Sequence, residues 1–217
     1  MVTKSKKERK TPQGEIRDKE RTKQNIIDAA GQIIRTEGFR AVTYTKVAKI
    51  AGVDRKLIYD YFGNLEELVA CYLKQNDYWD RVEAEKIEEA QEGITREFMS
   101  TLFRNQYSFF ESSPEMQNIV LWELMDYNQT LRELVDKREK WGSKVFKFSD
   151  KTFKGSNVNF RAVNAILLSA IYYLILHSKS NGSTVCEIDI TKPKGKKAIL
   201  DTIDQILGWA YEKVEGR

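Results

Sequence analysis

Two short amphipathic segments separated by one glycine constrain the fold of this chain more than any other feature. The stretch runs from Thr43 to Phe62 and reads TYTKVAKIAGVDRKLIYDYF. In the first segment, small apolar residues recur at helical spacing after a threonine that can cap the helix. Gly52 interrupts the pattern where a helix end favours positive φ, and Asp54 is a good N-cap for the second segment. Two short helices joined by a glycine turn are typical of a helix-turn-helix.

Basic residues open the second of these helices. Arg55 and Lys56 stand at the end where the helix macrodipole disfavours cations by a few tenths of a kcal/mol to about 1 kcal/mol each. That placement is explained if this end enters a major groove, where it meets base edges and phosphates. The alternative is an αα-hairpin with a solvated basic face. We expect base-edge contacts from Arg55, Lys56 and Leu57, groove-wall contacts from Tyr59 and Asp60, and phosphate contacts from Thr43, Tyr44, Thr45 and Tyr61.

Three motifs extend this stretch in both directions. They are TKQNIIDAAGQIIRTEGFRAVT, VAKIAGV and LIYDYFGNLEEL. Together they resemble the first helix, the second helix with its turn, and the signature leading into the fourth helix of TetR/AcrR-type transcriptional regulators. The resemblance covers residues 22–79, and the remainder of the chain is compatible with the family. Lys56, Asp60 and Leu65 depart from the residues that many members carry, so no operator preference is carried over.

The resemblance implies a homodimeric DNA-binding regulator, most often a repressor, whose larger helical domain binds an effector. Effector binding in such regulators changes the spacing of the two DNA-reading heads. By linkage, effector and DNA then weaken each other's binding by the same factor. The expected partners are a double-stranded DNA operator, roughly palindromic with half-sites about one helical turn apart, a second copy of the chain, and an unknown small apolar or amphipathic effector.

The composition indicates an all-α protein with a small domain followed by a larger one. Of the 217 residues, 41% are hydrophobic and 31% are charged, which permits a real core beneath well-solvated helices. We expect a flexible basic arm over 1–17, a helix-turn-helix DNA-binding domain over 18–64, and a helical regulatory and dimerisation domain over 65–217, opened by a connecting helix over 65–91.

Basic residues gather at the N-terminus, although the net charge of +4 is mild. Such a tail can lie along phosphates or reach a minor groove, with a contribution that falls steeply as salt rises. A solubilising tail is the alternative. The basic residues of this segment are Lys4, Lys6, Lys7, Arg9, Lys10, Arg17, Lys19, Arg21 and Lys23.

Two segments near the C-terminus predict a contact between subunits. Residues 158–178 include AVNAILLSAIYYLIL, which is apolar almost all round and needs covering on every side. A stripe of apolar residues three and four apart follows from about residue 196. A four-helix bundle with two helices from each subunit would cover both. The expected interface residues are Ile171, Ile175, Ile199, Ile203, Ile206, Leu207 and Ala210.

Aromatic residues of the larger domain have two interpretations. An apolar cavity with a few polar groups is the usual make-up of a small-molecule site, and a packed core is the alternative. The candidates for a ligand pocket are Tyr107, Phe110, Trp122, Met125, Tyr172, Tyr173 and His177.

Little in the sequence supports an enzyme. His177 is the only histidine, and Cys71 and Cys186 lack any metal or redox spacing. The sequence contains no phosphate-binding glycine loop and no nucleophile elbow. We therefore expect no catalytic residue, no metal and no cofactor.

The N-terminus and the apolar run Ala165–Leu176 predict a cytoplasmic protein without a membrane span. The N-terminus has charge but no apolar core of a signal peptide, and the run is shorter than the about 20 residues that a bilayer needs. Two other classes stay open. One is a DNA-binding dimer without a small-molecule ligand, whose C-terminal domain serves protein interaction only. The other is an enzyme or carrier built on the same fold.

Overall fold

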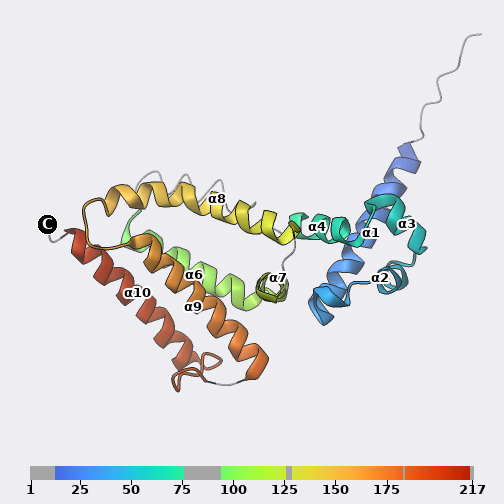
Figure 1. Ribbon diagram of the computed structural model, residues 1–217. Helices are drawn as coiled ribbons and strands as arrows, with labels where there is room; N and C mark the ends of the chain where they lie inside the picture. The colour runs from blue at the N-terminus through green and yellow to red at the C-terminus, as the bar shows by residue number, and fades with distance from the viewer. Residues whose placement is uncertain (1–12, 76–93, 126–128, 183, 216–217) are drawn as a thin grey trace, which may run out of the picture. The chain divides into compact units, whose positions relative to one another are not determined.

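The chain forms two compact units, Met1–Asn76 and Asp77–Arg217. The computed structural model describes residues 13–75, 94–125, 129–182 and 184–215 (Figure 1). These residues are helical apart from turns and one isolated bridge, which confirms the all-α class. The division falls after Asn76 rather than after residue 64, so the first unit contains the helix that begins at Leu65.

The first unit is built from four helices and a short 3-10 turn among its described residues. They are α1 (Gln13–Glu37), η1 (Phe39–Ala41), α2 (Tyr44–Ala51), α3 (Arg55–Phe62) and α4 (Leu65–Gln75). Because α1 begins at Gln13, residues 13–17 are helical and do not belong to a flexible arm. Residues 1–12 of the expected arm, and residues 76–91 of the expected connecting helix, lie outside the described residues.

Helix α1 forms the floor of this unit and packs against both α2 and α4. Its apolar face buries Ile26, Ile27, Ala30, Ile33 and Ile34. Burial of aliphatic side chains of this size stabilises a fold by roughly 1.5–3 kcal/mol each. Helix α1 therefore supplies much of the apolar burial that holds α2 in place directly and α3 through α2 and α4.

Helix α4 is seated on α1 by two contacts. The ring of Tyr72 lies directly over Gly31, where an added Cβ would overlap the ring. Near the end of α4, the side-chain amides of Gln24 and Gln75 donate to each other's oxygens, both at 3.1 Å. The described part of α4 is therefore fastened to α1 by close packing and by a reciprocal amide pair.

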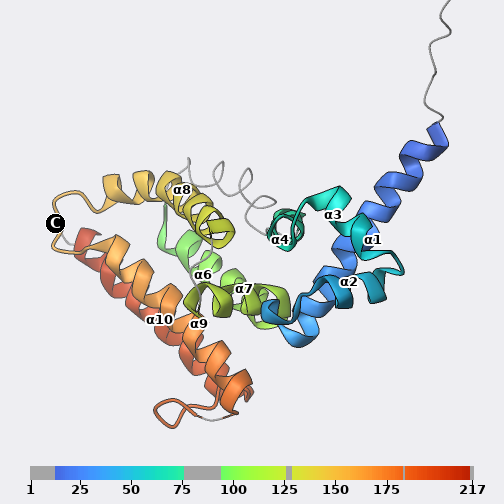
Figure 2. The ribbon, with the colours of Figure 1, turned by 45° about the vertical axis from the view of Figure 1, so that its right-hand side comes forward.

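The second unit consists of longer helices. They are α6 (Arg96–Ser112), α7 (Pro114–Met125), α8 (Gln129–Thr152), α9 (Phe160–Asn181) and α10 (Pro193–Glu215). Helix α6 packs against α7, α9 and α10, so it occupies the middle of the unit. Figures 1 and 2 show α9 and α10 running in opposite directions and joined at one end by a loop. Thr95 and Ser113 cap α6 and α7 by accepting from backbone N–H groups at 3.1 and 3.2 Å.

Helix α9 is longer than the apolar run within it. At 22 residues it has the length and apolar composition of a membrane span, a test that the core helix of a soluble protein also passes. Its buried face carries Leu167, Ile171 and Ile175, and Asn164 donates to the Phe160 carbonyl oxygen at 2.6 Å. Gly182 ends the helix in the left-handed conformation, with φ 63°. Gly52, the turn glycine of the first unit, has the same conformation with φ 68°.

Candidate nucleic-acid interface and ligand cavity

N-cap hydrogen bonds define where the two helices of the helix-turn-helix begin. The Lys46 backbone N–H donates to the Thr43 hydroxyl at 3.3 Å, and the Lys56 backbone N–H donates to the Asp54 carboxylate at 2.7 Å. Gly52 lies between them with φ 68°, a conformation that glycine adopts without strain. The start of each helix and the turn therefore lie where the sequence predicts them.

The inner face of the helix-turn-helix is closed by apolar packing. Val47 and Ala48 of α2 and Ile58 and Phe62 of α3 are buried. With these positions directed inward, the residues between them on α3 must face outward. The buried stripe thus fixes which face of α3 is presented to a partner.

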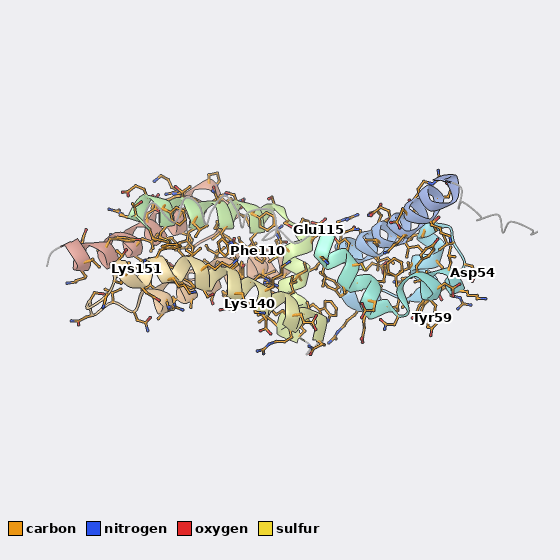
Figure 3. All side chains as sticks on the ribbon, turned by 90° about the horizontal axis from the view of Figure 1, so that it is seen from above. Asp54, Tyr59, Phe110, Glu115, Lys140 and Lys151 are labelled. Atoms are coloured by element: carbon orange, nitrogen blue, oxygen red, sulfur yellow. The ribbon has the colours of Figure 1, made fainter. Side chains whose placement is uncertain are left out.

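The outward face of α3 carries the expected DNA-contacting residues. Arg55, Lys56, Tyr59 and Asp60 are exposed, and Tyr59 retains 63% of its surface. Figure 3 shows Asp54 and Tyr59 on the outer side of the first unit. The remaining expected residues are exposed (Thr43 and Thr45) or half-buried (Tyr44, Leu57 and Tyr61).

Ile50 is an exposed apolar residue that the sequence pattern does not single out. It lies on α2 with 43% of its surface exposed. Its apolar character resembles that of the buried Val47, three residues earlier, so hydrophobicity alone would assign it to the core.

A cavity of about 390 Å³ lies within the second unit among α6, α7, α8 and α9. Its size falls within the range of about 300–1,000 Å³ typical of small-molecule sites. Apolar side chains form much of the wall, and they include Met99, Leu102, Phe103, Val145, Phe146 and Leu168. Polar side chains also line it, and they include Gln106, Glu123, Arg138, Glu139, Asn164 and Tyr172.

Only one of the seven residues expected in a pocket, Tyr172, lines this cavity. Tyr107 and Phe110 are completely buried in the core, and Figure 3 shows Phe110 among the helices of its unit. Met125 and Tyr173 are exposed. Trp122 and His177 are half-buried and do not line the cavity. The difference from the expected set arises from the rotation of each helix about its axis. Helix α6 directs Gln106 rather than Tyr107 to the cavity, and α9 directs Tyr172 rather than Tyr173.

The polar part of the cavity is organised by two hydrogen bonds. Gln106 Nε2 donates to Tyr172 Oη at 3.0 Å, and Arg138 Nη2 donates to Glu123 Oε2 at 3.2 Å. Burial raises the pKa of Tyr172 to about 12, with smaller opposing contributions from the charges of Arg138 and Glu123. The phenol is therefore neutral at physiological pH and keeps its proton.

The expected interface residues mostly face inward. Ile171, Ile175, Ile203, Leu207 and Ala210 are buried within the chain itself. Side chains already covered by their own subunit have little surface left for a partner. Ile199 and Ile206 are half-buried.

Part of the first unit is similar in sequence to known proteins. The family described as "Bacterial regulatory proteins, tetR family" matches residues 26–71. The "Fatty acid metabolism regulator protein" of Bacillus subtilis (strain 168) is 27% identical over 113 residues, which are 51% of this chain. The match covers 57% of that relative, so the chain spans little more than half of its length.

Solved structures share the fold. The fatty acid degradation regulator FadR from Bacillus halodurans has a TM-score of 0.59 at 19% identity, covering 92% of this chain and 96% of that one. FadR from Bacillus subtilis, solved in complex with stearoyl-CoA, has a TM-score of 0.60 at 19% identity, covering 85% and 96%. NalD from Pseudomonas aeruginosa, a repressor of a multidrug efflux pump, has a TM-score of 0.56 at 16% identity, covering 87% and 96%.

These matched proteins are transcription regulators rather than enzymes. The family match lies on the helix-turn-helix, and the fold likeness extends over both units. The chain therefore resembles the TetR family of bacterial regulatory proteins in the sequence of residues 26–71 and in its fold.

Proposed function

We propose that this protein is a ligand-responsive transcriptional repressor that acts in the cytoplasm as a homodimer on a roughly palindromic operator. The observation that carries the proposal is the first turn of α3. Arg55 and Lys56 are exposed there at a helix N-terminus, while the opposite face of α3 is buried in a TetR-family domain. Cations at this end oppose the helix macrodipole, and negatively charged DNA would remove that disadvantage.

The proposed reading of DNA divides between two sets of residues. Arg55, Lys56 and Leu57 contact base edges, with Tyr59 and Asp60 at the groove wall. The hydroxyls of Thr43, Tyr44, Thr45 and Tyr61 contact phosphates, which fix position without specifying sequence. The half-buried state of Leu57 leaves less of its surface for a base, so Arg55 and Lys56 contribute most of the specificity in this proposal.

The proposed dimer uses the uncovered faces of α9 and α10. Ile166, Tyr173 and Trp209 remain 68%, 58% and 56% exposed. Ile166 and Tyr173 are seven residues apart and so lie on one side of α9. Large apolar side chains left in water favour association, and a second copy placed by two-fold symmetry would cover both helices in a four-helix bundle.

The cavity supports a small-molecule effector over the alternative of a dimer without a ligand. It encloses about 390 Å³ behind a largely apolar wall with a few convergent polar groups. The similar FadR structure from Bacillus subtilis holds stearoyl-CoA, which supports an apolar or amphipathic effector for this chain as well. An effector that prefers the DNA-incompetent state then releases the operator by linkage.

DNA binding by the purified full chain to the region upstream of its own gene tests the proposal. The titration is carried out at several salt concentrations, with a nonspecific duplex as the matched control. We expect binding to the upstream DNA that survives moderate salt and protects a two-fold symmetric site. Equal affinity for both duplexes, lost together at modest salt, would overturn the proposal, because phosphate contacts alone produce that behaviour.

A further inference from the structure

We propose that the cavity recognises an uncharged apolar ligand through a carbonyl oxygen, which accepts hydrogen bonds from Tyr172 and Arg138. This inference rests on the proposed function and names the chemical class of its effector. The ligand class is an aliphatic ester, thioester or ketone, in preference to a free carboxylic acid.

Tyr172 supplies the first donor. Its oxygen accepts from Gln106 Nε2 at 3.0 Å, and among the described residues no acceptor is present for its own proton. The ring is held in place by Phe110, with ring centroids 4.3 Å apart. With a pKa of about 12, the hydroxyl keeps its proton at physiological pH. A ligand oxygen in the cavity can therefore receive a hydrogen bond from a well-positioned donor.

Arg138 supplies the second donor. Its side chain is only 13% exposed, and Nη2 donates to Glu123 at 3.2 Å. The Nε–H of the same guanidinium is buried, with no acceptor within the part of the chain that the structure describes. A buried donor without an acceptor is costly. Because protein atoms cover Nε, we expect the guanidinium to turn toward the cavity that it lines when a ligand oxygen arrives.

The charges around the cavity favour an uncharged acceptor. Glu123 and Glu139 line the cavity together with Arg138 and Arg161. Arg161 is already paired with Asp150, whose carboxylate it meets at 2.6 and 3.0 Å. Arg138 is paired with Glu123 in the same way, so the remaining lining charge is the Glu139 carboxylate, which repels an entering carboxylate. A carbonyl oxygen satisfies the same donors without bringing a buried charge.

The wall beyond these donors determines the rest of the ligand. Met99, Phe103 and Leu168 are among the side chains that line it, and none of them offers a strong hydrogen-bonding group. An aliphatic chain attached to the carbonyl would be removed from water against this wall. The two features together select a molecule with one acceptor and an apolar body.

Tryptophan fluorescence of the full-length protein tests the inference, because Trp141 lines the cavity. The probes are methyl octanoate, octanoate and n-octane, titrated at pH 7. We expect methyl octanoate to bind about ten times more tightly than octanoate, because the carboxylate is repelled and costly to bury. We expect it to bind about five times more tightly than n-octane, as one or two hydrogen bonds provide. S-methyl thiooctanoate should bind as the ester does.

Three variants assign the effect to residues. Tyr172→Phe should weaken methyl octanoate binding about five-fold while leaving n-octane unchanged, because only the donor is lost. Arg138→Lys keeps the charge beside Glu123 but removes Nε, and should weaken the ester by a similar factor. Ser178→Ala is the control, because it also removes a hydroxyl from α9 but at a position that does not line the cavity, and it should change neither probe. Circular dichroism melting confirms that each variant is folded.

The outcomes separate this inference from the function on which it rests. Octanoate binding as tightly as the ester, or a Tyr172→Phe variant that still distinguishes ester from n-octane, overturns the carbonyl assignment and leaves an effector cavity in place. Binding of octanoyl-CoA but of no simple ester also overturns it, because recognition then lies in the nucleotide. Failure of every probe removes both this inference and the ligand-responsive part of the function, whereas DNA binding is measured independently.

Discussion

The two units differ in how tightly they are filled. In the first, the Tyr72 ring lies so close to Gly31 that one added carbon does not fit. The second encloses a cavity of about 390 Å³ beside two donors that lack acceptors among the described residues. Close packing resists deformation, whereas a cavity lined by imperfectly paired polar groups can change shape when a ligand enters. In the proposed function, the difference suits a rigid unit that binds DNA and an adaptable unit that binds the effector.

Gly31→Val should have the largest effect, because it disrupts the close packing of α1 against α4 in the first unit. The new side chain meets the Tyr72 ring, and overpacking of this kind costs about 1–3 kcal/mol. We expect a lower melting temperature and loss of operator binding, with ester binding in the second unit retained. Gly142→Ala is the control, because its Cβ meets Phe146 at an ordinary 3.5 Å. Equal stability of the two variants would show that the α1–α4 contact is not tight.

Arg55→Ala sharpens the assignment of the exposed helix N-terminus. We expect a loss of about 1–3 kcal/mol in operator binding together with a relaxed preference at one base position. Competition assays with single-base operator variants measure both. Arg132→Ala, an exposed arginine in the second unit, is the matched control. A loss that is uniform across all sequences would make Arg55 a phosphate contact.

Asp54→Ala removes the N-cap of α3 and should have a smaller effect. The Lys56 backbone N–H loses its 2.7 Å acceptor, which typically costs about 1 kcal/mol. Denaturant unfolding should show that loss, while Asp54→Asn should stay close to the parent because asparagine caps as well. A parent-like Asp54→Ala variant would mean that tertiary packing alone fixes the start of the helix.

The smallest expected effect is on the unfolding free energy at alkaline pH, because the ionisation of Tyr172 does not change stability at physiological pH. Burial raises the pKa of Tyr172 to about 12 from an ordinary value near 10. The neutral phenol is favoured in the folded state, so its stabilisation is complete below pH 10 and is lost as the pH rises from 10 to 12. Tyr172→Phe should make this part of the curve of unfolding free energy against pH less steep, while Tyr107 and Tyr211, whose pKa values burial also raises, maintain part of the slope. An unchanged slope would show that Tyr172 does not titrate differently in the folded chain.

The helix-turn-helix could be predicted because its signals are local. Thr43, Gly52 and Asp54 each act within a few residues of their own position, through a cap or a positive φ. Ser113 and Pro114 mark the start of α7 by the same kind of local signal. Such short-range hydrogen bonds and backbone preferences leave a direct record in the sequence.

The cavity could not be predicted because it depends on the rotation of long helices about their axes. Neighbouring residues such as Gln106 and Tyr107, or Tyr172 and Tyr173, differ in environment although the surrounding pattern is apolar on several faces. The same ambiguity assigned Ile171 and Leu207 to an intersubunit contact when they are buried within the chain. Helix α8, which lines much of the cavity, carries mostly charged and polar residues and gave no comparable signal.

The seating of α4 on α1 has a mechanical consequence. A torque applied near Gln75 acts on a joint with two separate attachments, the Gln24–Gln75 amide pair and the Tyr72 ring over Gly31. Two attachments resist both sliding and rolling, so α4 and α1 turn together rather than shear. Helix α3, which contacts α2 and α4, would then move with them. We therefore expect a change that reaches α4 to reorient the first unit rather than to deform it.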